Sequence, residues 1–177
     1  MTDWNGLAWR TLPAPLRTLG RWVTLIQIVG YTTSLVFVWR TTSFTPPGIA
    51  ARYRGVVDSA GSGPLGGSAG AGGAMQFPKS FAEMLTITHT HILGMAAIFA
   101  ISGLCLALCT RPGERWRRFF IAEPFVALFV SFSSMWLMRY VDPRFAWLLE
   151  ASSASLAVVF YLQSWWILRE LGGGGGA

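Results

Sequence analysis

Both histidines of the chain lie in one run, Ile87-Thr88-His89-Thr90-His91, inside a long apolar stretch. An ionisable side chain is costly in hydrocarbon and is seldom found there without a role. Imidazole nitrogens bind metal ions and exchange protons near neutral pH. We therefore expect any chemistry of this protein at or near His89 and His91.

One face of the helix expected over residues 85–109 collects most of its polar and sulfur-bearing side chains. Alternating steps of four and three residues place them in one row. The row contains Met84, Thr88, His91, Met95, Ile98, Ser102, Cys105 and Cys109. His89 points about 200° away from His91. It begins a second row that includes the small residues Ala96, Ala100 and Gly103, which favour close packing on another helix or a partner subunit.

Several chemistries fit His91. Imidazole and thioether ligands suit copper(I), and His91 with Met95 and Met84 presents both types, with Met138 as an additional ligand. His91 alone can ligate the iron of haem b. Glu150 is expected at a matching depth in the last span, so the two residues can form a polar site.

That polar site admits two further interpretations. Together with Arg139, His91 and Glu150 could bind a quinone or relay protons, as an enzyme or a proton-coupled carrier would. The alternative is that the stripe is ordinary bundle packing and that His91 is a hydrogen-bond partner of Glu150. Cys105 and Cys109 are interpreted as reduced, small apolar residues.

The elements that position these residues are membrane spans. Apolar residues make up 53% of the chain, its mean hydropathy is +0.46, and charged residues make up 12%, against about 25% in soluble domains. Stretches of about 20 apolar residues match the hydrocarbon thickness. They predict helices at about 22–39, 85–109, 119–140 and 145–168. We expect a single all-α transmembrane domain, a four-helix bundle covering residues 1–177.

Sequence signals predict where helices begin. Ser80 and Glu83 have capping-box spacing, so the second helix should start near Ser80. Pro124 is expected at the first position of the regular part of the third helix, which leaves Glu123 without a functional role.

Two glycine-rich segments are expected to stay without regular structure. Residues 59–74 form a Gly/Ser/Ala-rich tether in a long loop, and residues 172–177 form a disordered tail.

The arginine distribution predicts the orientation in the membrane. Arginines before the first span, between the second and third spans and after the fourth span fall on one side if both termini are cytoplasmic. The long loop then faces the periplasm, and His91 lies near that side. The net charge of +6 fits attraction to anionic lipid headgroups and does not indicate a nucleic-acid partner.

The sequence contains none of the familiar catalytic motifs: no phosphate-binding glycine loop, no His-Glu-x-x-His and no Cys-x-x-Cys-His. An enzyme is therefore the less favoured class. We expect a non-catalytic subunit or accessory factor of a larger membrane complex, which contacts other membrane subunits or a second copy of itself. The alternative is a copper- or haem-binding membrane protein that uses His91.

A family resemblance rests on several short segments. They are Tyr53-Arg54-Gly55, the run from Phe77 through Leu85 to His91, Trp136-Leu137-Met138-Arg139-Tyr140, and Phe145-Ala146-Trp147-Leu148. Together they resemble small, uncharacterised bacterial inner-membrane proteins with four helices and a His-x-His in the second. The resemblance implies this architecture and a bacterial inner-membrane location, and it implies no activity.

Overall fold

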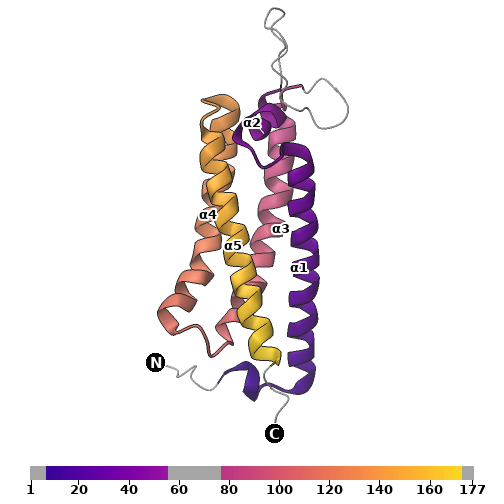
Figure 1. The fold of residues 1–177 in the computed structure, drawn as a ribbon, viewed down its shortest axis with the longest axis vertical. Coiled ribbons are helices and arrows are strands. Elements are labelled where there is room, and N and C mark those ends of the chain that lie inside the picture. Colours follow the sequence, from indigo (N-terminus) through magenta and orange to yellow (C-terminus); the bar gives the residue numbers. More distant parts are fainter. Residues whose placement is uncertain (1–6, 56–76, 173–177) are drawn as a thin grey trace, which may run out of the picture.

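The computed structural model describes residues 7–55 and 77–172, and every regular element in these ranges is helical. They are the 3-10 helix η2 (Trp9–Thr11) and the helices α1 (Ala14–Thr42), α2 (Pro46–Arg54), α3 (Phe81–Ala107), α4 (Glu114–Tyr140) and α5 (Phe145–Gly172) (Figure 1). The expected tether at 59–74 lies outside the described residues. So does the expected tail, except for Gly172, which ends α5.

Four helices, α1, α3, α4 and α5, are long and apolar enough to cross a membrane. This confirms the predicted transmembrane helical bundle. The apolar stretches misplace the helix ends, because a helix continues into polar residues beyond the hydrocarbon, where hydropathy no longer marks it. The largest differences are the starts of α1 at Ala14 and of α4 at Glu114, whereas α3 ends at Ala107, slightly before its expected end.

The start of α3 is set by the predicted capping box. The backbone N–H of Glu83 donates to Ser80 Oγ at 3.3 Å, and the backbone N–H of Ser80 donates to Glu83 Oε2 at 2.7 Å. These bonds satisfy two backbone donors that the first turn of a helix otherwise leaves unpaired. The prediction for Ser80 and Glu83 is confirmed.

The interpretation of Pro124 as a first helical residue is wrong. Helix α4 begins at Glu114 and runs through Pro124, which lies inside it. Proline in a helix interior removes one backbone hydrogen bond and crowds the preceding turn, which bends the helix. In Figure 1 the first turns of α4 lean away from α5.

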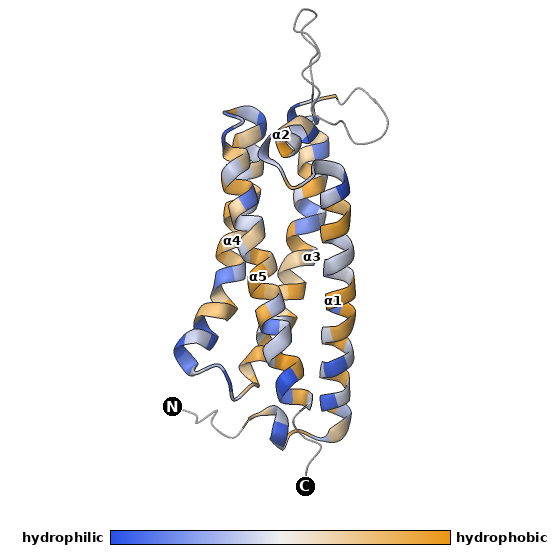
Figure 2. Cartoon of the chain, viewed as in Figure 1, coloured by the Kyte–Doolittle hydropathy of each residue, from blue (hydrophilic) through white to orange (hydrophobic). Residues whose placement is uncertain are grey.

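The central core draws on all four spans. Tyr31 of α1, Phe99 of α3, Leu128 of α4, and Leu156 and Phe160 of α5 form one buried cluster. The rings of Tyr31 and Phe160 stack with their centroids 4.3 Å apart. Helix α1 is the least enclosed span. In its apolar 18-residue segment 6% is buried, against 33% in the corresponding segment of α4. Figure 2 shows hydrophilic residues gathered mainly toward the two ends of the bundle.

Helix α2 covers the end of the bundle at which α3 begins and α4 ends (Figure 1). The apolar pattern does not predict it, because it is short and its signals are local: Thr45 caps the backbone N–H of Gly48 at 3.2 Å, and prolines fill its first turn. Ile49 packs on Met138 and Ala146, and the Arg54 guanidinium donates to the Met138 carbonyl at 2.9 Å.

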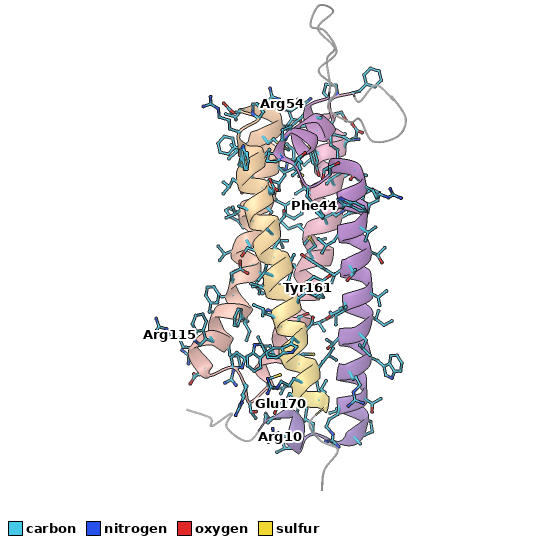
Figure 3. The ribbon with its side chains drawn as sticks, in the orientation of Figure 1. Arg10, Phe44, Arg54, Arg115, Tyr161 and Glu170 are labelled. Atoms are coloured by element: carbon cyan, nitrogen blue, oxygen red, sulfur yellow. The ribbon has the colours of Figure 1, made fainter. Side chains whose placement is uncertain are left out.

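The opposite end is closed by η2. Trp9 is 4% exposed, and its indole N–H donates to the Cys105 carbonyl at 2.8 Å. Arg10 pairs with Glu170 of α5 at 3.2 Å (Figure 3). Gly20 of α1 admits the Trp9 ring, because a Cβ at position 20 would lie 2.4 Å from Trp9 Cη2.

We predict that Gly20→Ala destabilises the folded protein by about 1 to 3 kcal/mol, because the added methyl displaces the Trp9 ring. Gly30→Ala is the matched control in the same helix, because a Cβ there meets nothing within 4 Å. It should be neutral or stabilising by up to about 1 kcal/mol. Thermal unfolding in detergent measures both variants. Equal effects of the two substitutions would contradict this account of Gly20.

Candidate functional site

Both histidines lie on the outer surface of the bundle. His89 and His91 are exposed, and from Phe81 to His91 the axis of α3 rises about 15 Å, so the side chains lie within a span. His91 Nδ1 lies 2.9 Å from the carbonyl oxygen of Ile87, one turn earlier. This bond orients the ring and leaves Nε2 directed to the surroundings of the helix.

The other members of the predicted stripe turn inward. Met84 is 0% exposed and Ser102 is 2% exposed, and Met95 is half-buried against the central core. Thr88 accepts a hydrogen bond from the indole N–H of Trp136 at 2.9 Å. His91 is therefore the exposed member of a row that otherwise packs inside.

None of the predicted partners of His91 is joined to it by a hydrogen bond or ion pair within the described residues. Glu150 of α5 is half-buried, and within the described residues no hydrogen bond or ion pair joins it to His91. The Arg139 guanidinium donates to the Lys79 carbonyl at 2.8 Å. Met138, the additional copper ligand considered from the sequence, is fully buried under α2. A site shared by His91 and Glu150 stays a prediction.

The second predicted row is divided between two environments. Gly103 is buried, and a Cβ there would lie 3.5 Å from Ile121 of α4, so this glycine serves contact between α3 and α4. Ala96 is half-buried, whereas Ala100 and His89 are exposed. The exposed part of this row is free to contact lipid or another subunit.

Residues 7–55 and 77–172 contain no group of three or more His, Cys, Asp and Glu side chains placed to hold a metal ion. Of the proposed copper ligands, Met84 lies inside the bundle, His91 lies on its surface, and Met95 is half-buried. Copper binding by these residues stays a prediction.

A second group of polar side chains lies between α4 and α5, and it centres on Pro124. Because proline has no N–H, the carbonyl of Phe120 loses its helical partner. The side-chain amide of Gln163, 0% exposed, donates to this carbonyl at 2.5 Å. A residue of α5 thus satisfies the backbone of α4 at the break. In a membrane span an unsatisfied carbonyl would cost several kcal/mol.

The same seam between α4 and α5 contains further polar contacts. The Ser155 hydroxyl donates to Glu123 Oε1. Ser131 and Ser152 share a hydrogen bond of 2.7 Å.

Four buried oxygens of α4 and α5 have no hydrogen-bond partner within the described residues. They are Glu123 Oε2, Ser134 Oγ, Glu150 Oε2 and Gln163 Oε1. When the carboxyls are ionised, three of these four oxygens can accept a hydrogen bond but cannot donate one. The seam therefore holds more acceptors than donors.

Gln163 was not singled out from the sequence, and Glu123 was expected to have no functional role. Their signal is present, because a carboxyl and an amide side chain in apolar runs are unusual and a proline next to the carboxyl marks a lost hydrogen bond. Interpreting Pro124 as a helix start hid this signal.

Cys109 follows the end of α3 and is 1% exposed. It packs with Trp9 and Leu171. Burial raises the pKa of its thiol to about 12. Cys105 and Cys109 are both free thiols.

Comparison with known proteins gives one match. The Aq_1264_TM family model, described as a transmembrane helical domain, matches residues 43–173. The chain belongs to this family. No curated protein and no solved structure matches the chain. The region matched by the transmembrane helical domain begins directly after α1 and covers α2 to α5, which include the histidines and the seam between α4 and α5.

We predict that Gln163→Leu destabilises the protein by about 1 to 3 kcal/mol, because it leaves the Phe120 carbonyl without a donor. In a Pro124→Ala background the same substitution should cost less, because the new N–H at position 124 can bond to that carbonyl. A double-mutant cycle by thermal unfolding in detergent measures the difference. If the stability effects of Gln163→Leu and Pro124→Ala are additive, Gln163 does not satisfy the carbonyl that Pro124 leaves free.

We predict that Cys109 resists maleimide in the folded protein at about pH 9, slightly above the ordinary thiol pKa of about 8.5. Because its folded-state pKa is raised, folding favours the neutral thiol. That contribution to stability is complete below the ordinary pKa and is lost as the pH rises toward about 12.

A Cys105→Ser variant isolates Cys109 for this measurement. The control is Thr110→Cys, an exposed neighbouring position, in a protein without the two native cysteines. Mass spectrometry follows both labelling rates. Similar rates at positions 109 and 110 would contradict the burial of Cys109.

Proposed function

We propose that this protein is a non-catalytic subunit or accessory factor of a larger complex in a bacterial inner membrane. We further propose that it contacts its partner through the outer face of α3. This face consists of exposed residues on one side of the helix: Thr86, His89, Thr90, Leu93, Ala97, Ala100 and Leu104. The observation that carries the proposal is the exposure of His89 within a membrane span.

The energetic argument separates His89 from its polar neighbours. The hydroxyls of Thr86 and Thr90 donate to backbone carbonyls one turn earlier, so these residues are compatible with lipid. His89 has no hydrogen bond within the described residues. An imidazole facing hydrocarbon without a partner costs several kcal/mol. A hydrogen-bonding group on another protein removes this cost.

The shape of the outer face of α3 fits a helical partner. Ala97 and Ala100 are small, and the adjacent Gly94 has nothing within 4 Å of a Cβ built on it. Small residues let two membrane helices approach closely. We therefore propose as the partner a membrane-spanning helix of another subunit that offers a hydrogen-bonding side chain at the depth of His89.

We base the proposed orientation on the arginines and on the four candidate spans among the described residues. The first turn of α1 and the end of α5 lie at the same end, where the Arg21 guanidinium donates to the Leu171 carbonyl at 2.7 Å. Arg115 and Arg118 lie in the first turns of α4 at this end. We propose that this end faces the cytoplasm and that α2 faces the periplasm.

A second candidate function is cofactor binding by His91. The hydrogen bond from the histidine ring to the Ile87 carbonyl is the kind of contact that orients metal-binding histidines, and it leaves Nε2 available. In this function His91 supplies one ligand to copper or to haem iron, and a second copy or another subunit supplies the rest. A carrier or enzyme using His91, Glu150 and Arg139 is the weakest candidate, because no contact joins the three within the described residues.

We predict that His89→Ala loses a subunit that the unmodified protein retains when purified from native membranes. Thr90→Ala is the matched control, because its hydroxyl bonds within α3 and should not contribute to the interface. Quantitative mass spectrometry of the purified complexes measures the loss. Equal retention by His89→Ala and Thr90→Ala would contradict the proposed interface.

The same preparations test the second candidate. Under cofactor binding, His91→Ala removes a Soret absorbance band or stoichiometric copper, and His89→Ala retains it. Absorbance spectra and metal analysis measure both. If the unmodified protein shows neither a Soret band nor bound copper, His91 is excluded as a ligand of haem or copper.

A further inference from the structure

Positive charge is concentrated around the first turns of α4. Four arginines lie in residues 111–118, and Glu114 is the only acidic residue among them. The Arg118 guanidinium pairs with the Glu114 carboxylate. Arg115 is exposed, and within the described residues it makes no hydrogen bond or ion pair. The surface of this segment therefore keeps positive charge that the protein itself does not neutralise.

Two of these arginines line an open hollow in the surface. Its volume is about 430 Å³, and it is lined by Glu114, Arg115 and Arg118. Figure 3 shows Arg115 directed away from the bundle, on the part of α4 that leans away from α5. Because Arg118 already compensates the carboxylate of Glu114, the guanidinium of Arg115 gives the hollow a net positive charge.

An exposed apolar stripe leads from this hollow into the membrane span. Steps of four and three residues along α4 place it on the same face as Arg115. The stripe consists of Phe119, Ala122, Val126 and Phe129, all of them exposed. The exposed ring of Trp116 lies beside its start, with its centroid 6.0 Å from that of Phe119. Cationic groups, an interfacial aromatic ring and an apolar track thus follow one another along one side of the helix.

This order of groups matches the order of groups in a phospholipid. Arginines at the end of a span extend their guanidiniums to the headgroup level while their methylene stems stay on apolar surface. Tryptophan rings favour the same level. A free phosphate would contact the guanidiniums and gain nothing from the apolar stripe. The net positive charge of the hollow favours an anionic headgroup over a zwitterionic one, which carries its own cation.

We propose that Arg115 and Arg118 bind the headgroup phosphate of an anionic phospholipid whose acyl chain packs along Phe119, Ala122 and Val126. The lipid holds the leaning segment of α4 at the membrane interface. This site shares no residue with the outer face of α3, so it is independent of the partner contact proposed there.

The test measures lipid binding to the full chain in detergent by native mass spectrometry. The probes are phosphatidylglycerol, phosphatidylcholine with the same acyl chains, and glycerol phosphate, which offers the phosphate without the chains. Phosphatidylglycerol should bind about tenfold more tightly than phosphatidylcholine, and Arg115→Gln/Arg118→Gln should lose about tenfold in affinity for phosphatidylglycerol, since each arginine contributes several-fold to binding of anionic lipid. Glycerol phosphate at equal concentration should not displace phosphatidylglycerol.

The matched control is Arg40→Gln/Arg144→Gln, which removes two exposed arginines from the opposite end of the bundle. It should retain the affinity for phosphatidylglycerol. Equal losses in the two double variants would show attraction by net charge alone and would overturn the proposal. Equal binding of phosphatidylglycerol and phosphatidylcholine would also overturn it, as would displacement of phosphatidylglycerol by glycerol phosphate.

A second measurement does not depend on the folding of any variant. Hydroxyphenylglyoxal modifies accessible guanidinium groups, and mass spectrometry locates the modified arginines in the unmodified protein. A small molar excess of phosphatidylglycerol in detergent should slow modification of Arg115 and Arg118 at least several-fold and leave the rate at Arg144 unchanged. Rates at Arg115 that are equal with and without phosphatidylglycerol would overturn the proposal.

Discussion

Within hydrocarbon every backbone polar group must be satisfied by the chain itself, and at Phe120 helix α4 cannot do so alone. Pro124 removes the donor, and the Gln163 amide replaces it from α5 at 2.5 Å. This bond fixes the rotation of both helices along their seam. It also leaves Gln163 Oε1 buried without a partner. The burial of an amide side chain in the seam follows from this replacement.

The same constraint acts at the helix ends, where the last carbonyls have no partner in their own helix. Arginine side chains meet several of them. Arg21 donates to Leu171 at the end of α5, Arg54 to Met138 near the end of α4, and Arg117 to Cys109 just after α3. Arginines interpreted from the sequence as signals of orientation therefore also tie neighbouring elements together. Because Arg54 belongs to α2, that helix is part of the bundle end.

The four spans could be predicted because lipid demands long apolar helices, and the start of α3 could be predicted because its cap is local to Ser80 and Glu83. The rotation of each helix could not. The stripe on α3 grouped Met84 and Ser102, which lie inside the bundle, with His91, which lies on its surface. Rotation depends on packing against every neighbour at once, and that information is spread over the whole chain.

Buried and exposed polar groups of the bundle need hydrogen-bond partners from different sources. A polar atom inside, such as Glu123 Oε2, must be satisfied from within the bundle, because another protein cannot reach it. An imidazole outside, such as His89, can be satisfied by a group on a second protein, because the face that carries it is open. Both lie in the region matched by the transmembrane helical domain family, whereas α1 lies outside it. Helices α2 to α5 therefore contain both the buried oxygen and the exposed imidazole that need a partner.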